Sequence, residues 1–177
     1  MQLPSTVLWN VPGTGHHPIS DVLERSIAAA KERIEIVNPY VTDRAIIRLL
    51  HAAAQRGVRV RIIVPGKPTP PFPAAAFRHH YPRLIDAGVE ILLHPEMAHA
   101  KVATIDDQVL IGGCNLDQRS LFRNDELDVL FEGRQIVDRV DREVFDELAK
   151  VSSVASPSTR MRDRLWNASM DRLSLLL

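Results

Sequence analysis

The residues whose types and spacing suit chemistry lie in one short window, from His99 to Glu126. His99 and Lys101 are two positions apart, and side chains at i and i+2 of an extended strand lie on the same face. An imidazole that titrates near neutrality can attack an electrophile or give a proton to a leaving group, while lysine supplies a fixed positive charge. The pair therefore suits a phosphate ester as its substrate.

A second predicted strand and a glycine turn follow this pair. Residues 109–111 are apolar and predict a buried strand, after which Gly112 and Gly113 allow the sharp turn that presents Asn115. Asn115 can then donate a hydrogen bond to a phosphoryl oxygen beside Lys101.

Carboxylates nearby can support the imidazole. Residues 125–131 alternate acidic and apolar side chains, which predicts a strand with Glu126 and Asp128 on one face. A carboxylate that reaches a catalytic imidazole fixes its tautomer and stabilises the cation that forms during attack. The residues alone leave Glu126 and Asp128 as equal candidates for this role, and they explain Asp106 equally well as a turn residue.

The complete window resembles the repeat of the phospholipase D superfamily, the HKD motif, which reads H-x-K-x-x-x-x-D followed by G-[SG]-x-N. The first part lies at 99–106, and the second reads Gly-Gly-Cys-Asn at 112–115, one residue closer than in the common form of the family. Residues 115–120 and 124–127 are most similar to the C-terminal half of bacterial cardiolipin synthases. The residues to which the resemblance gives catalytic roles are His99, Lys101, Asn115, Glu126 and Asp106.

The resemblance also implies a mechanism. In this superfamily two HKD repeats form one active centre, in which one histidine attacks phosphorus to give a phosphohistidine and the other protonates the leaving alcohol. The resemblance implies that Glu126 orients His99, and it implies no metal or other cofactor. This chain has one repeat, so the resemblance implies a homodimer or a separate HKD half as partner. The expected function is that of a phospholipid phosphodiesterase or phosphatidyltransferase with a phosphatidylglycerol-like substrate.

Two alternatives stay open, a homodimeric phospholipase D-type endonuclease and a non-catalytic lipid-binding half-domain. The chain of 177 residues has 22 Lys and Arg against 22 Asp and Glu, so no global charge attracts nucleic acid, which is therefore not the expected partner. Its one cysteine, Cys114, excludes an intramolecular disulfide and fits a reducing compartment. Without a long apolar run or a signal-peptide pattern, we expect a cytoplasmic protein, with peripheral contact at the inner face of the cell membrane as an option.

The elements that must position the site alternate along the chain. The predicted helices cover 21–32, 43–55, 74–86 and 135–150, and the predicted strands cover 5–9, 34–37, 58–64, 89–93, 99–105, 109–111 and 125–131. Repeated helix, glycine and strand predict an α/β half-domain with a mixed, largely parallel sheet and helices on both faces. We expect a phospholipase D-like domain at 1–151, a linker at 152–158 and an amphipathic C-terminal helix at 159–177.

Three further residues are expected at the rim of the site. The segment 65–73 has five prolines and leaves the end of a strand, where α/β proteins usually bind their substrates, so Lys67 and Phe72 are placed there. Tyr40 follows the end of another strand, and it lines the mouth of the site or packs in its own turn. Of His79 and His80, on the predicted third helix, at most one is expected to reach a site, and a solvated face is the default expectation for both. The C-terminal helix has a local charge of +2 and can dock on the domain, join a partner or rest on an anionic bilayer.

Overall fold

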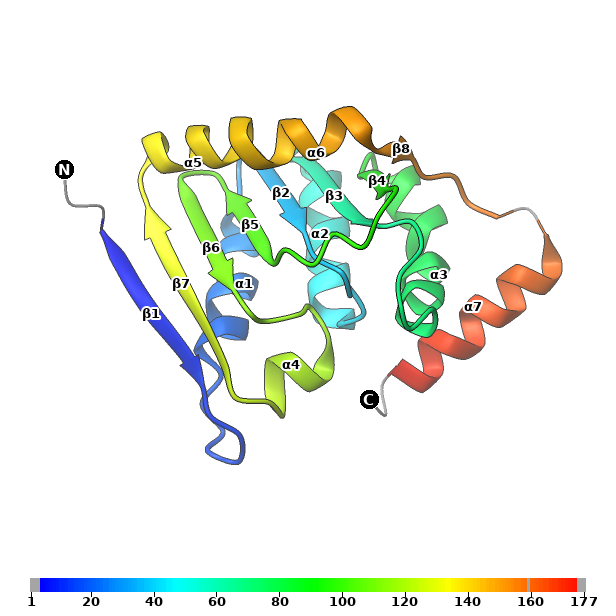
Figure 1. The fold of residues 1–177 in the computed structure, drawn as a ribbon, viewed down its shortest axis with the longest axis horizontal. Coiled ribbons are helices and arrows are strands. Elements are labelled where there is room, and N and C mark those ends of the chain that lie inside the picture. The colour runs from blue at the N-terminus through cyan, green and yellow to red at the C-terminus, as the bar shows by residue number, and fades with distance from the viewer. Residues whose placement is uncertain (1–3, 159, 175–177) are drawn as a thin grey trace.

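One mixed sheet runs through the molecule (Figure 1). The computed structural model describes residues 4–158 and 160–174. In spatial order the strands are β1 (Ser5–Asn10), β7 (Glu126–Glu132), β6 (Gln108–Gly112), β5 (Val102–Ile105), β2 (Arg33–Val37), β3 (Arg59–Pro65), β4 (Glu90–His94) and β8 (Ser153–Val154). The helices are α1 (Pro18–Ala29), α2 (Arg44–Gln55), α3 (Phe72–Asp86), α4 (Gln118–Phe122), α5 (Arg134–Val140), the π-helical turn η1 (Asp141–Phe145), α6 (Asp146–Val151) and α7 (Met161–Leu173).

Parallel pairing is confined to β2, β3 and β4, and the other neighbouring strands pair antiparallel. The α/β class and the mixed sheet are confirmed, but the expected large share of parallel pairs is corrected to a mostly antiparallel sheet. The physical reason is the length of the connections. The connections that contain α2 and α3 are long crossovers and produce the two parallel pairs, whereas a tight turn joins β5 to β6 and directs the chain back.

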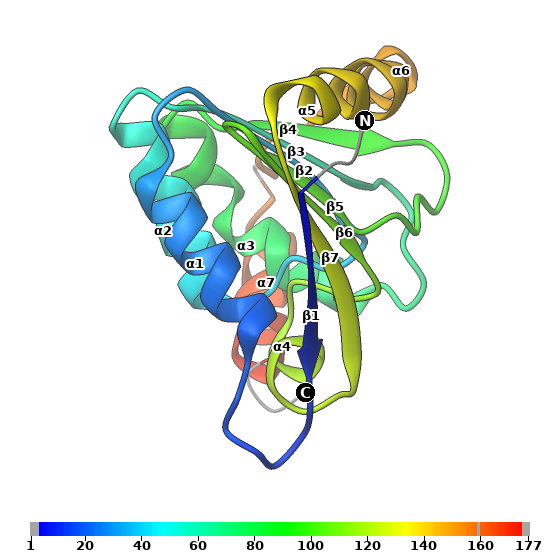
Figure 2. The same cartoon turned by 90° about the vertical axis from the view of Figure 1, so that its left-hand side faces the viewer.

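Helices cover both faces of the sheet, as predicted (Figure 2). The helices α1, α2 and α3 lie on one face, and the continuous helix formed by α5, η1 and α6 lies on the other. Consecutive strand residues supply the two cores: Ile62 belongs to the core under α1, α2 and α3, and Ile63 to the core under α5 and η1. Both side chains are fully buried, so the sheet forms the rigid middle layer on which the site is built.

Helix starts differ from the prediction at two places and agree at a third. The helix α1 begins at Pro18 rather than at Asp21, and α3 begins at Phe72, inside the segment expected to be irregular. Proline is well suited to the first turn of a helix, where no intrahelical bond needs its missing N–H. The helix predicted at 43–55 is confirmed as α2, and the Asp43 carboxylate caps it by accepting a hydrogen bond from the Ile46 N–H at 2.9 Å.

The C-terminal segment lies against the domain. Two residues of the predicted linker form β8, which pairs with Leu92 and Leu93 of β4. The predicted C-terminal helix is described over Met161–Leu173, while residues 159 and 175–177 fall outside the described residues. The helix α7 packs against α3 and buries the polar residues Asn167 and Asp171. Among the helices of the described ranges, none is long and apolar enough to cross a membrane.

Candidate active site

His99 and Lys101 lie together at the start of β5. The strand predicted from His99 begins at Val102, although the Lys101 carbonyl still accepts a hydrogen bond from the Gly112 N–H at 3.2 Å. The Lys101 amine lies 2.9 Å from Nδ1 and 3.1 Å from Nε2 of His99, and it donates to the His99 carbonyl oxygen at 3.0 Å. The His99 side chain is exposed, whereas Lys101 is only 9% exposed. The structure therefore brings the two residues onto one side, as the spacing predicts.

Lys101 stands among carboxylates. Burial lowers the pKa of its amine, and the negative charges of Glu126, Asp117 and Asp128 act in the opposite direction. The Lys101 amine lies within 3.1 Å of both ring nitrogens of His99, so it can donate to whichever of them offers a lone pair. An imidazole nitrogen with a free lone pair is also the group that can attack an electrophile.

The glycine turn after β6 is held by Asp128. The Asp128 carboxylate accepts hydrogen bonds from the N–H groups of Gly113 at 2.9 Å and Cys114 at 3.1 Å, and it is 3% exposed. A Cβ on Gly112 would lie 1.9 Å from Asp128 Oδ1 and 2.6 Å from its Cα, so the close approach of the two backbones requires glycine. Burial raises the pKa of Asp128, and the two N–H donors oppose that rise. Asp128 is thus engaged in shaping the turn.

Asn115 and Glu126 make few hydrogen bonds with the described residues around them. The Asn115 amide donates to Ser120 Oγ at 3.4 Å, and its Oδ1 is buried with no hydrogen-bond partner among the described residues. Glu126 Oε1 accepts from Asn124 Nδ2 at 3.2 Å, and a Cβ on Gly113 would lie 3.1 Å from Glu126 Oε2. Within the described ranges Glu126 makes no hydrogen bond to His99.

Two of the three predicted rim residues line a cavity beside Asn115. This cavity has a volume of about 300 Å³, and both Tyr40 and Phe72 contribute to its wall. The Tyr40 hydroxyl donates to the Thr69 carbonyl at 2.6 Å, and burial, reinforced by the Asp117 carboxylate, raises its pKa. Lys67 is exposed and does not line the cavity.

Asp117 and Arg119 also line this cavity, and the sequence reasoning assigned them no role in the site. Asp117 caps α4 by accepting from the Ser120 N–H at 2.7 Å. Both residues belong to the polar run at 117–120, which follows Asn115 and contributes to the resemblance to cardiolipin synthases. The spacing of these residues does not indicate which of their side chains reach the cavity.

Asp106 lies at the opposite end of β5 from Lys101. Its carboxylate accepts hydrogen bonds from the N–H groups of Lys31 at 2.9 Å, Glu32 at 3.0 Å and Arg33 at 3.0 Å. Burial raises the pKa of Asp106, but these three donors more than offset it and leave the pKa below its usual value. With a φ of 50°, Asp106 closes the β5–β6 turn and ties it to the start of β2. The structure does not bring it to the other site residues.

A single HKD motif on a mixed α/β sheet, with its histidine exposed, defines the class of protein as a phospholipase D-type half-domain. The family model described as "Cardiolipin synthase, PLD-like domain" matches residues 23–148. The chain belongs to this family. The resemblance expected from the sequence is therefore confirmed.

Known relatives agree with this assignment. The chain is 33% identical to cardiolipin synthase of Staphylococcus aureus (strain Mu50), over 86% of this chain and 31% of that protein. It is 32% identical to cardiolipin synthase A of Pseudomonas putida (strain GB-1), over 82% of this chain and 31% of that protein. The chain thus spans less than a third of the length of these relatives.

Two solved structures share the fold. The phospholipase D family member Nuc from Salmonella typhimurium matches with a TM-score of 0.73 and 18% identity, over 87% of this chain and 99% of that one. Phosphatidylserine synthase from Haemophilus influenzae matches with a TM-score of 0.78 and 15% identity, over 98% of this chain and 46% of that one. At these identities the similarity establishes the fold alone.

Proposed function

We propose that the protein is a phospholipid phosphodiesterase or phosphatidyltransferase that works through a phosphohistidine at His99. The observation that carries the proposal is the contact between the exposed His99 ring and the Lys101 amine at 2.9 Å, with Asn115 and Glu126 on the adjoining turn and strand. The sequence similarity to cardiolipin synthases supports a phosphatidylglycerol-like substrate.

The residues divide the reaction between them. A lone pair of His99 attacks phosphorus, the bond from phosphorus to the leaving alcohol breaks, and that alcohol takes a proton from a second histidine. The second histidine then accepts the proton of a lipid hydroxyl or of water, whose oxygen displaces His99 from phosphorus. Lys101 and the Asn115 amide stabilise the non-bridging oxygens, and Glu126 orients the imidazole.

The second histidine must come from outside this HKD motif. One ring cannot serve as the deprotonated nucleophile and as the proton donor on opposite sides of phosphorus. His99 is exposed, so the site is accessible to another half that would bring this residue. We assign that part to a second copy of the chain or to a separate HKD half.

The test is an assay of the purified chain on phosphatidylglycerol vesicles, with lipid products identified by mass spectrometry. We expect His99→Asn to lower turnover by more than about a hundredfold. His16→Asn is the matched control, because His16 is an exposed loop residue, and it should retain full turnover. The covalent lipid-phosphate adduct should form on the wild type and not on His99→Asn.

A parallel assay on nucleic acid separates the alternatives. Cleavage of nucleic acid without lipid turnover would replace the proposal with an endonuclease. Binding of lipid with neither activity, by a chain shown to be dimeric, would replace it with a non-catalytic lipid-binding half-domain.

A further inference from the structure

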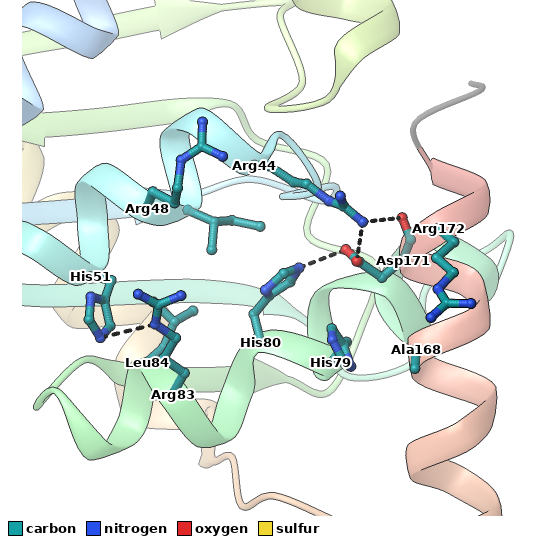
Figure 3. Close-up of a pocket in the computed structure, with 11 residues that line it drawn as sticks. Arg44, Arg48, His51, His79, His80, Arg83, Leu84, Ala168, Asp171 and Arg172 are labelled. Carbon is teal, nitrogen blue, oxygen red and sulfur yellow. Dashed lines mark hydrogen bonds and ion pairs between the residues drawn. The ribbon is translucent and has the colours of Figure 1, made fainter.

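A second cavity lies between α2, α3 and α7 (Figure 3). Its volume is about 390 Å³. The charged side chains that line it are Arg44, Arg48, Arg83, Arg172 and Asp171. Four guanidinium groups against one carboxylate leave three positive charges uncompensated, in a chain whose total charges balance at 22 of each sign. Because the arginines come from three separate helices, the concentration of charge is a property of the folded molecule.

The single carboxylate is already fully used. Asp171 is 5% exposed, and its Oδ2 accepts a hydrogen bond from Arg44 while its Oδ1 lies 2.7 Å from Nε2 of His80. Figure 3 shows these contacts converging on Asp171 from α2 and α3. His80 is therefore partly buried and engaged, in contrast to the solvated position expected for it. Asp171 fixes the geometry of the three helices and neutralises one arginine.

The other arginines keep their donors available. The side chains of Arg48 and Arg172 make no hydrogen bond or ion pair with any residue in the described ranges. Arg83 contacts only His51 through its side chain, at 3.4 Å between Nε and Nε2, and Nε of Arg44 is buried without a partner in the part of the chain that the structure describes. The lining of the cavity thus includes guanidinium groups from α2, α3 and α7 whose donors are not all taken up by acceptors among the described residues.

We propose that this cavity binds a phosphate-type anion with two or more negative charges. Guanidinium groups pair with phosphate oxygens through two parallel charge-assisted hydrogen bonds, and several of them around one cavity favour a multiply charged ligand over a single carboxylate. A soluble phosphate and the headgroup of an anionic phospholipid share this chemistry. His51 and His79, which also line the cavity, add further donors.

The cavity is distinct from the candidate active site. It shares no lining residue with the cavity beside Asn115. The two cavities are neighbours along the chain at both ends of this region. Near the start of α2, Thr42 lines the cavity beside Asn115 and Arg44 lines the second cavity. Near the end of α7, Ser174 lines the cavity beside Asn115 and Arg172 lines the second cavity. The proposed site therefore stands beside the cavity that Asn115 lines, with its own set of anion-binding groups.

Calorimetric titration with pyrophosphate and inorganic phosphate tests the proposal. The background is His99→Asn with Lys101→Met, so that phosphate binding at the candidate active site does not contribute. We expect one binding event, weakened about tenfold or more by Arg48→Gln with Arg172→Gln, which removes two unpaired guanidinium groups. The control is Arg142→Gln with Arg162→Gln, an equal loss of charge at exposed arginines outside the cavity, which should leave the affinity unchanged.

Vesicle flotation identifies the source of the anion. Binding to phosphatidylglycerol-containing vesicles that pyrophosphate reverses and the cavity variant weakens would assign the site to a lipid headgroup. Calorimetric binding without vesicle binding would assign it to a soluble phosphate. The proposal is overturned if neither probe binds, or if the cavity variant and the control variant lose affinity equally. Catalytic turnover is not a readout here, so the outcome is independent of the proposed function.

Discussion

Gly112 and Gly113 are neighbours in the turn that presents Asn115, yet they meet different surroundings. A Cβ at Gly112 would overlap the backbone and carboxylate of Asp128, whereas one at Gly113 would meet only the end of the Glu126 side chain at 3.1 Å. We expect Gly112→Ala to lower the free energy of unfolding by about 2–4 kcal/mol, and Gly113→Ala to lower it by less than about 1 kcal/mol. Urea unfolding of the two variants measures the difference, and equal losses would contradict this account of the turn.

The two carboxylates of β7 are predicted to differ in what they support. Asp128→Ala leaves the Cys114 N–H without an acceptor and the Gly113 N–H with only the Leu127 carbonyl at 3.4 Å, so it should cost about 2–4 kcal/mol of stability. Glu126→Gln removes a charge near Lys101 without exposing a buried donor, so it should abolish turnover while changing stability by less than about 1 kcal/mol. Unfolding and lipid turnover, measured on both variants, test this division. A turnover loss in Glu126→Gln that merely follows unfolding would refute it.

At the same scale, the sequence was informative where spacing alone decides contact. His99 and Lys101 meet as expected because two residues of extended chain place side chains on one side. Spacing could not separate Glu126 from Asp128, because both face the same way on β7 and only the approach of the glycine turn engages Asp128. Nor could it show that Asp106 is tied to residues 31–33, since that contact joins segments far apart in the chain.

At the scale of elements, helix and strand patterns were predictable and their pairing was only partly so. The helix predicted at 43–55 follows from local chemistry, because Asp43 caps α2 and its apolar residues Ile46, Ile47 and Leu50 are buried. The order of the strands in the sheet depends on how the connections between them cross it. The alternation of residues within β5 and β6 does not indicate which strands become their neighbours. The cavity at α2, α3 and α7 was equally hidden, because its arginines are far apart in the sequence.

The central strand β2 carries a buried carboxylate that makes the stability of the sheet depend on pH. Burial raises the pKa of Glu35 to about 7 from an ordinary 4.5, against the opposing charge of Arg61. The folded state therefore holds this proton more tightly than the unfolded state, and the stability that Glu35 provides falls as the pH rises from about 5 through 7. We expect Glu35→Gln to raise the free energy of unfolding by about 1–3 kcal/mol at pH 8 and to leave it nearly unchanged at pH 5.

Glu90 offers the matched control for this prediction. It pairs with the same Arg61, at 2.7 Å, but its side chain is 47% exposed. Glu90→Gln should give no gain in stability at pH 8, because its charge is solvated. Urea unfolding at both pH values decides the matter, and a gain in Glu90→Gln equal to that in Glu35→Gln would show that burial is not the cause.

At the scale of the whole molecule, the chain matches very different shares of the proteins it resembles. It covers 99% of Nuc but only 46% of the phosphatidylserine synthase and 31% of the S. aureus cardiolipin synthase. One unit of this fold thus forms almost the whole of one known structure and less than half of another. The single HKD motif and the exposed His99 make the arrangement of two units the central question for this chain.

A mixed dimer answers that question directly. If one His99 attacks phosphorus and the other protonates the leaving group, a dimer with one wild-type copy and one His99→Asn copy has lost one of two indispensable groups. We expect light scattering to give the mass of two copies, and the mixed dimer, purified through two different tags, to retain at most about 1% of wild-type turnover on phosphatidylglycerol vesicles. A mixed dimer containing one His16→Asn copy should keep full turnover. If the His99→Asn mixed dimer retained half the wild-type turnover, each copy would hold a self-sufficient site. If the chain were instead a monomer that turns over lipid only with an added HKD half, the second histidine would be assigned to that partner.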